Sequence, residues 1–224
     1  MAALRLRGLY AVTPDTADSA GLVAKVRDAI SGGAVVVQYR SKLSDALLRR
    51  VQAEMLLDVC RNSGVPLVVN DDLAMALRIG ADGVHLGHED VAPLAARGQA
   101  QQGFIVGASC YDDLGLALAA ARDGASYLAF GAAFPSRTKP GAVHATRALF
   151  ERARQQFTLP IAAIGGITLD NASALLDAGA DLLAVISDLF DSTDVAARAA
   201  AYAALFRRFV PSAGASSSAS GSGV

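Results

Sequence analysis

The sequence predicts a single α/β domain with the fold of a TIM (β/α)8 barrel. Hydrophobic residues make up 53% of the 224 residues and charged residues only 18%, which suits a buried parallel sheet covered by helices. Short apolar stretches alternate with helical patterns along the whole chain. A Gly-Ala phrase also recurs at intervals of roughly 40 to 55 residues, about two βα units each. Together these observations indicate one repeated architecture.

Eight apolar stretches have the length of strands. They are residues 9–12, 34–39, 67–70, 83–86, 105–109, 127–131, 161–165 and 182–186. Helical stretches lie between them, such as 112–123 and 44–61, where the apolar residues Leu47, Leu48, Val51, Met55 and Val59 recur at helical spacing. An open doubly wound sheet is the structural alternative, but no Gly-x-Gly-x-x-Gly turn follows the first strand. Eight βα units therefore favour the closed barrel.

The recurring Gly-Ala phrase marks the link from a helix to the next strand. It occurs at Gly33, Gly80, Gly124 and Gly179, each time after a helical stretch and directly before an apolar one. Glycine just past a helix end accepts the left-handed conformation that caps the last turn. We therefore expect four αβ turns at these positions.

Composition and charge limit the classes of function. Residues 1–210 are expected to form the barrel, and residues 211–224, nearly all Ser, Ala and Gly, to form a disordered tail.

A net charge of −1 favours neither nucleic acid nor an anionic membrane as partner. No stretch reaches the ~18 consecutive apolar residues of a membrane span, and no signal peptide is recognisable. Cys60 and Cys110 fit neither a zinc nor a disulfide pattern. We expect a cytoplasmic protein that binds small molecules, and a homo-oligomer is compatible with the sequence.

Polar phrases follow most of the predicted strands. In a parallel barrel the loops after the strands' carboxyl ends form one face, which carries the active site. We therefore expect these phrases to converge there. They are Gln38-Tyr39-Arg40-Ser41-Lys42, Asn70-Asp71-Asp72, His85-Leu86-Gly87-His88-Glu89-Asp90, Ser109, Ser136-Arg137-Thr138-Lys139, Gly165-Gly166 and Ile186-Ser187.

The last two strands end in a pattern typical of a monophosphate site. Gly165-Gly166 would let backbone N–H groups approach phosphate oxygens, and helices near Asp170 and after Ser187 would direct their N-terminal dipoles at the anion. The alternative is that Gly165-Gly166 only forms a tight turn. Ile186-Ser187 at the end of the last strand favours the phosphate site.

A second anion site is predicted from Arg40, Lys42 and Lys139 together with the carboxylates of Asp71 and Asp90. Hard oxygen ligands without His or Cys at metal spacing favour Mg²⁺, which takes one or two carboxylates and completes its shell with phosphate oxygens and water. A pyrophosphate group would use every member of this set. The alternative is a ring of salt bridges among the same residues.

Other polar residues have simpler interpretations. Asp72 is expected to cap the next helix. His85 and His88 have no third zinc ligand in a recognisable pattern and are expected to be structural or supporting residues. His144 is expected to be solvated, and Cys110 has no neighbouring base that would make it a nucleophile.

Seven phrases together resemble thiamine-phosphate synthases in order and spacing over about residues 9–190. They are Gln38-Tyr39-Arg40-Ser41-Lys42, Asn70-Asp71-Asp72, Asp82-Gly83-Val84-His85-Leu86-Gly87, Glu89-Asp90, Thr138-Lys139, Gly165-Gly166-Ile167-Thr168 and Ile186-Ser187. The resemblance implies an enzyme that joins 4-amino-5-hydroxymethyl-2-methylpyrimidine diphosphate to 4-methyl-5-(2-phosphooxyethyl)thiazole, releasing pyrophosphate. It implies Mg²⁺ at Asp71 and Asp90. It places the pyrimidine diphosphate on Gln38, Tyr39, Arg40, Ser41, Lys42, Asn70, Ser109 and Lys139, and the thiazole phosphate on Ser136, Arg137, Thr138, Gly166, Ile186 and Ser187. Arg40, Lys42 and Lys139 would be its catalytic cations.

The sequence departs from the family pattern at two positions. Ser41 stands where an acidic residue is common, and His88 where Gln is common. Neither change removes a charge that the reaction needs. The rival functions are a related thiazole tautomerase on the same barrel, which has no pyrophosphate to release, and a non-catalytic sensor of phosphate ligands. Asn70, Asp71, Asp90 and Lys139 favour the synthase.

Overall fold

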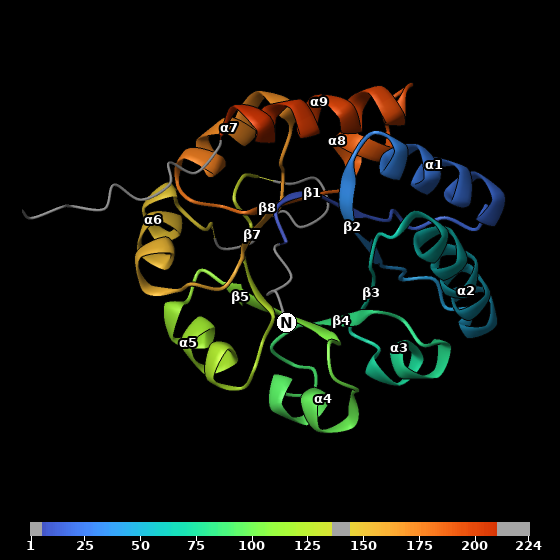
Figure 1. Ribbon diagram of the computed structural model, residues 1–224, viewed down its shortest axis with the longest axis horizontal. Helices are drawn as coiled ribbons and strands as arrows, with labels where there is room; N and C mark the ends of the chain where they lie inside the picture. The colour runs from blue at the N-terminus through green and yellow to red at the C-terminus, as the bar shows by residue number, and fades with distance from the viewer. Residues whose placement is uncertain (1–5, 136–143, 210–224) are drawn as a thin grey trace, which may run out of the picture.

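The structure is a computed structural model that describes residues 6–135 and 144–209. Within these ranges eight parallel strands close into a barrel in the order β1 to β8. Figure 1 shows the helices as a ring around the strands, with sequence order running round the ring. β1 therefore pairs with both β2 and β8. The predicted TIM barrel is confirmed.

The elements of the described ranges alternate as expected. The strands are β1 Gly8–Val12, β2 Ala34–Tyr39, β3 Leu67–Asn70, β4 Gly83–Leu86, β5 Ile105–Tyr111, β6 Tyr127–Phe130, β7 Ile161–Ile164 and β8 Leu182–Val185. The helices are α1 Ser19–Ser31, α2 Ala46–Ser63, α3 Leu73–Ile79, α4 Pro93–Gln99, α5 Leu114–Arg122, α6 Arg147–Gln156, α7 Leu169–Asp177, α8 Ser187–Phe190 and α9 Val195–Arg208. Every predicted strand is present, with ends that differ by two residues or fewer.

The strands alternate between two buried faces, because successive side chains of a strand point to opposite sides. Tyr10, Val36 and Val68 belong to a cluster inside the barrel. Their neighbours Val37 and Leu67 belong to the larger cluster between the strands and the helices. This alternation decides which residue of each polar phrase reaches the barrel interior.

Helix α2 exists as predicted, but of the five residues whose spacing indicated it only Val59 is buried. Leu47 is 63% exposed, Val51 38% and Met55 37%. The face turned to the sheet lies on a different side of the helix and consists of Gln52, Ala53, Leu56, Leu57, Val59 and Cys60. The apolar period therefore identified the helix without identifying its buried face, since two apolar stripes run along it.

The four predicted αβ turns are confirmed by backbone geometry. Gly33, Gly80, Gly124 and Gly179 have φ values of 106°, 73°, 86° and 99°. These positive angles are accessible to glycine at little cost. Each turn returns the chain to the same end of the barrel, so that all eight strands run in parallel.

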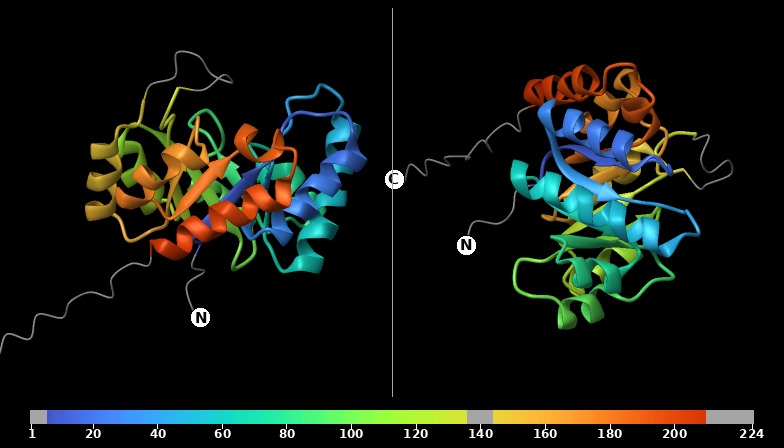
Figure 2. Two further views of the ribbon diagram at one scale, coloured as in Figure 1. Left: turned by 90° about the horizontal axis from the view of Figure 1, so that it is seen from above. Right: turned by 90° about the vertical axis from the view of Figure 1, so that its right-hand side faces the viewer.

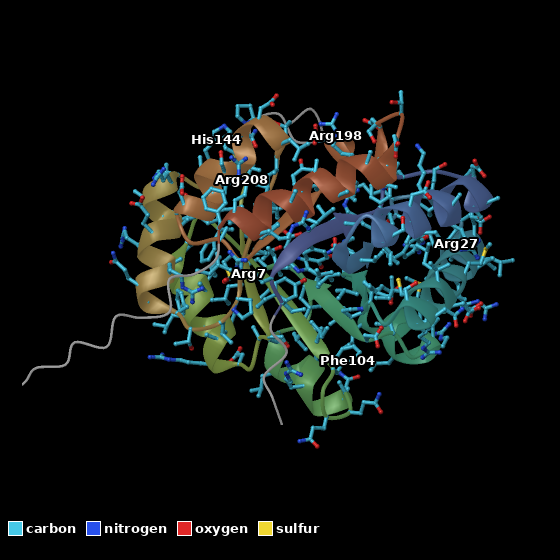
Figure 3. All side chains as sticks on the ribbon, turned by 45° about the horizontal axis from the view of Figure 1, so that its top comes forward. Arg7, Arg27, Phe104, His144, Arg198 and Arg208 are labelled. Atoms are coloured by element: carbon cyan, nitrogen blue, oxygen red, sulfur yellow. The ribbon has the colours of Figure 1, made fainter. Side chains whose placement is uncertain are left out.

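The amino-terminal end of the barrel is held against the last helix. Arg7, near the middle of the view in Figure 3, lies with its guanidinium carbon 5.5 Å from the centre of the Phe206 ring. It also donates to the carbonyl oxygens of Phe206 and Phe209. At the other end, toward which the strand arrows point in the left view of Figure 2, the chain continues from β8 into the short helix α8. None of the helices within residues 6–135 and 144–209 is sufficiently long and apolar to cross a membrane.

Candidate active site

The phrase after β2 divides between the two faces of the strand. Gln38 points into the barrel, where its Nε2 donates to the Tyr10 hydroxyl at 2.7 Å. Tyr39 points outward, and its hydroxyl donates to Oε1 of Gln52 on α2 at 2.9 Å. Its side chain is therefore away from the barrel interior, and any contact of Tyr39 with a substrate must come from its backbone.

Two residues that follow β1 hold the cationic phrase in place. Thr13 and Arg40 exchange two hydrogen bonds of 2.9 Å, because the Thr13 hydroxyl donates to the Arg40 carbonyl and accepts from the Arg40 N–H. The Asp15 carboxylate lies 3.6 Å from the Arg40 guanidinium and accepts the backbone N–H of Lys42 at 2.7 Å. Asp15 thus orients the Arg40 side chain and the Lys42 backbone together.

The acidic phrase after β3 forms a tight turn. Asp71 has a φ of 63°, a left-handed conformation that Asp adopts more readily than most residues. Asp72 then caps α3, since its carboxylate accepts the Met75 N–H at 2.8 Å. The predicted cap is confirmed. The turn therefore separates a capping carboxylate from one that stays at the barrel mouth.

The carboxyl groups of Asp71 and Asp90 lie within hydrogen-bonding reach of each other. Partial burial and the negative charge of Asp90 raise the pKa of Asp71 from 3.8 to about 6, while the positive charge of Arg40 opposes this shift. Asp90 is fixed by the Gly87 N–H, which donates to its Oδ2 at 2.7 Å. The structure thus brings together Asp71, Asp90 and Arg40 from three different loops.

This acid pair fits a hard divalent cation. Two adjacent carboxylates repel each other unless they share a proton or a cation. Among the described residues there is no group of three or more His, Cys, Asp and Glu side chains able to hold a metal alone. The pair therefore matches Mg²⁺, which needs only one or two carboxylates when phosphate oxygens complete its shell.

The described residues do not form the ring of salt bridges that was the alternative to a ligand site. Among them, no ion pair joins Arg40 or Lys42 to Asp71 or Asp90, and Arg40 pairs instead with Asp15. Ser41 is half-buried and Lys42 is exposed. Among these residues, neither cation neutralises the acid pair through an ion pair, as a salt-bridge ring would require.

Ser109 is connected to Gln38 across the barrel interior. The hydroxyls of Tyr10 and Tyr127 are 2.7 Å apart, the Tyr127 hydroxyl is 2.8 Å from Nδ1 of His85, and Nε2 of His85 is 2.9 Å from the Ser109 hydroxyl. Burial lowers the pKa of His85 to about 4 and raises the pKa of both tyrosines. His85 is therefore neutral, and its predicted supporting role agrees with this position.

The glycine pair after β7 forms a close turn against the segment that follows β6. Gly165 and Gly166 have φ values of 99° and 61°, and a Cβ at Gly166 would lie 2.5 Å from the Pro135 carbonyl oxygen. The Asn171 side-chain amide also donates to the Gly166 carbonyl at 2.9 Å. Glycine is thus required here by geometry. Helix α7 begins at Leu169, beside the predicted Asp170, and α8 begins at Ser187, one residue earlier than predicted.

The other predicted residues lie at the ends of strands, at the surface or outside the described residues. Ile186 is half-buried and Ser187 is the exposed first residue of α8. Asn70 ends β3 on the inward pleat, opposite His85. His88 and His144 are both exposed, and His144 lies at the edge of the molecule in Figure 3. Outside the described residues lie Ser136, Arg137, Thr138 and Lys139, together with the tail 211–224.

Sequence reasoning missed four residues that organise the site. Thr13 and Asp15 follow β1, so the same rule that found the other polar phrases would have found them. Tyr10 and Tyr127 lie inside apolar strands, and period-two alternation places them on the inward face. The signal for these two is a hydroxyl at an interior position, where it must find a partner.

Comparisons with known proteins find similar proteins over nearly the whole chain. The family model described as thiamine monophosphate synthase matches residues 9–189. A thiamine-phosphate synthase of Azoarcus sp. (strain BH72) is 54% identical over 202 residues, covering 90% of this chain and 98% of the relative. One from Thiobacillus denitrificans is 51% identical over 199 residues, with 89% and 94% covered. The solved structure of thiamine phosphate pyrophosphorylase from Pyrococcus furiosus has a TM-score of 0.81 at 31% identity, covering 92% of this chain and 98% of that one.

Proposed function

Because the chain belongs to the thiamine monophosphate synthase family, we propose that it couples 4-amino-5-hydroxymethyl-2-methylpyrimidine diphosphate to 4-methyl-5-(2-phosphooxyethyl)thiazole. The products are thiamine monophosphate and pyrophosphate. The single observation that carries this proposal is the Asp71–Asp90 acid pair beside Arg40 at the barrel mouth. A pair of this kind suits a substrate that brings a diphosphate and its metal ion.

Each substrate has its own set of residues in the proposal. The pyrimidine diphosphate binds to Gln38, Arg40, Lys42, Asn70, Ser109 and Lys139. Tyr39 and Ser41 belong to the same binding segment, 38–42. Ser136, Arg137, Thr138, Gly166, Ile186 and Ser187 bind the thiazole phosphate. The support for this division is that the first set lies in or just after the last residues of β2, β3 and β5, and the second follows β7 and β8, apart from the segment 136–139.

Asp71 and Asp90 would hold Mg²⁺, which supplies positive charge for the diphosphate leaving group. Arg40, Lys42 and Lys139 add charge to the same oxygens. As the C–O bond breaks, its electron pair passes to pyrophosphate, and these cations stabilise the charge that develops there. Asp15 keeps Arg40 in position for this step.

The carbon left behind is a pyrimidinylmethyl cation, which the ring's amino group stabilises. The thiazole nitrogen donates its lone pair to this carbon and closes the new C–N bond. Because the thiazole phosphate is anchored separately, the nitrogen is held close and reacts before water does. The proposed reaction needs neither a protein nucleophile nor a general base. This agrees with the state of Cys110, whose thiol is buried and whose pKa burial raises to about 12.

The acid pair also separates the synthase from a thiazole tautomerase. A tautomerase releases no pyrophosphate, so its reaction would not need the metal ion that Asp71 and Asp90 would hold. We also propose a cytoplasmic location, and a homo-oligomer is compatible with the sequence. The location is supported by two free, buried cysteines.

The test is a coupling assay with the purified protein. With both heterocycles and Mg²⁺ present, we expect thiamine monophosphate and pyrophosphate to appear in equal amounts. Omission of either heterocycle should abolish the accumulation of thiamine monophosphate. If none forms with both substrates present, the proposed function is wrong. If the thiazole phosphate instead isomerises without the pyrimidine, the tautomerase is the correct function.

A further inference from the structure

The hydrogen-bonded chain inside the barrel links residues of five strands. It runs from Gln38 on β2 through Tyr10 on β1, Tyr127 on β6 and His85 on β4 to Ser109 on β5. The two ends, Gln38 and Ser109, are assigned to the pyrimidine substrate in the proposed function. The three residues between them have no part in the proposed function.

The order of protons along this chain follows from its first donor. The Gln38 NH₂ group can only donate, so the Tyr10 oxygen accepts from it and the Tyr10 proton is available for Tyr127. The buried Tyr127 hydroxyl then needs an acceptor for its own proton, and Nδ1 of His85 is its other partner among the described residues. A neutral imidazole that accepts at Nδ1 carries its proton on Nε2. His85 therefore donates to the Ser109 oxygen, and the Ser109 proton is left for a partner outside the chain.

The surroundings hold this arrangement in one geometry. Tyr10, Tyr127 and His85 are fully or almost fully buried, so a hydroxyl that lost its partner would find no water to replace it. The Tyr127 ring packs edge-on against Tyr10 and is stacked on His85. Tyr127 also occupies the space that a side chain at Gly107 would fill, because a Cβ there would collide with the phenol ring.

We propose that Tyr10, Tyr127 and His85 are positioning residues that hold the Ser109 hydroxyl as a hydrogen-bond donor toward the pyrimidine diphosphate. This inference rests on the proposed function, in which Ser109 binds that substrate. The acceptor is an atom with a lone pair, either a ring nitrogen or a phosphate oxygen. A Ser109 hydroxyl that donated inward to His85 would present only lone pairs to such an atom and would weaken binding.

The first test reads the tautomer of His85 in the substrate-free protein. Nitrogen-15 NMR of histidine-labelled protein distinguishes the Nε2–H from the Nδ1–H form, and a His85→Gln variant identifies the signal among the three histidines of the chain. We expect the Nε2–H form in the wild type. In Tyr127→Phe we expect the signal to shift toward the other tautomer, since Nδ1 has lost its donor. An Nδ1–H form in the wild type would make Ser109 the donor to Nε2 of His85 and overturns the proposal.

The second test measures the effect on the substrate. Tyr127→Phe keeps the ring that fills the space at Gly107 and removes only the hydroxyl. We expect kcat/KM for the pyrimidine diphosphate to fall about tenfold, with KM for the thiazole phosphate unchanged. The matched control is Tyr202→Phe, which removes a buried hydroxyl that donates to Asp188 at 2.7 Å outside the barrel. The control should change neither kcat/KM for the pyrimidine diphosphate nor the His85 tautomer.

A double variant decides whether Tyr127 acts through Ser109. In a Ser109→Ala background, Tyr127→Phe should cost no more than about twofold. If the full effect persists there, Tyr127 acts by another route and the inference is wrong. If Tyr127→Phe does not fold, Tyr10→Phe, which interrupts the same chain one step earlier, is measured in the same way.

The two proposals fail in distinguishable ways. An inactive wild type in the coupling assay contradicts the proposed function, whereas the tautomer measurement needs no substrate and still decides the proton order. An active wild type with an unaffected Tyr127→Phe variant contradicts the inference alone.

Discussion

The backbone N–H of Asp71 donates to the carbonyl oxygen of His85 at 2.8 Å, which joins the turn after β3 to the end of β4. This bond holds Asp71 in its left-handed conformation and brings its carboxyl to that of Asp90. The same residue, His85, extends its side chain into the barrel toward Ser109. One strand end therefore supports both the acid pair and the serine.

The two adjacent aspartates of this turn should differ in their importance. Asp71→Asn keeps a residue that tolerates positive φ but removes the carboxylate, and we expect kcat/KM to fall about hundredfold or more. Asp72→Ser keeps a good helix cap and should retain activity within about twofold. Steady-state kinetics of both variants, with circular dichroism to show that they are folded, check this. Equal losses in the two variants would contradict the division of roles.

The acid pair also predicts how Mg²⁺ and pH affect stability. The pKa of Asp71 is raised to about 6 in the folded protein, so between its ordinary value and about 6 the folded state holds a proton that the unfolded state has lost. The stability that this proton contributes is present at low pH and is lost as pH rises through about 6. Above that pH, we expect Mg²⁺ to take the place of the proton between the carboxylates.

Thermal unfolding measures this exchange. We expect Mg²⁺ to raise Tm at about pH 7.5 and to have little effect at about pH 5, where the proton competes with the metal. Asp71→Asn should remove most of the Mg²⁺ effect at the higher pH. A Tm increase of the same size at both values would show that Mg²⁺ acts elsewhere.

Asp15 is expected to contribute through Arg40 and Lys42. Asp15→Ala removes the carboxylate that orients both residues, and KM for the pyrimidine diphosphate should rise about tenfold with that for the thiazole phosphate unchanged. Glu54→Ala is a matched control, because it breaks the exposed Arg50–Glu54 pair on α2. Such exposed pairs contribute little. Initial rates against each substrate in turn measure the effect, and equal KM changes for the two substrates would contradict it.

Gly166→Ala should combine backbone strain with a collision. Its φ of 61° is close to the 67° of Gly64, but a Cβ at Gly64 meets nothing within 4 Å. We therefore expect Gly64→Ala to lower the free energy of unfolding by about 1 kcal/mol. Gly166→Ala should lower it by about 1–3 kcal/mol more and raise KM for the thiazole phosphate. Denaturant unfolding and kinetics of the pair check this, and equal unfolding energies would contradict the role of close contact.

Much of the site could be predicted because its residues follow strand ends. The strand pattern and the rule that loops after strands share one face bring Arg40, Asp71 and Asp90 together without any knowledge of side-chain positions. The helical period of α2 was equally clear. Its buried face was not, because Leu47 and Leu56 belong to different apolar stripes, and only packing against the sheet selects between them.

The sequence alone determined the barrel, the edge at which polar residues gather and the distinction between Asp71 and the capping Asp72, because strand period, turn glycines and helix caps are local. Only the tertiary structure decided that Tyr39 faces α2, that Asp15 holds Arg40, and that Tyr10, Tyr127 and His85 connect Gln38 to Ser109. These contacts join residues far apart in the chain. Their distances depend on how the barrel closes, which no local pattern records.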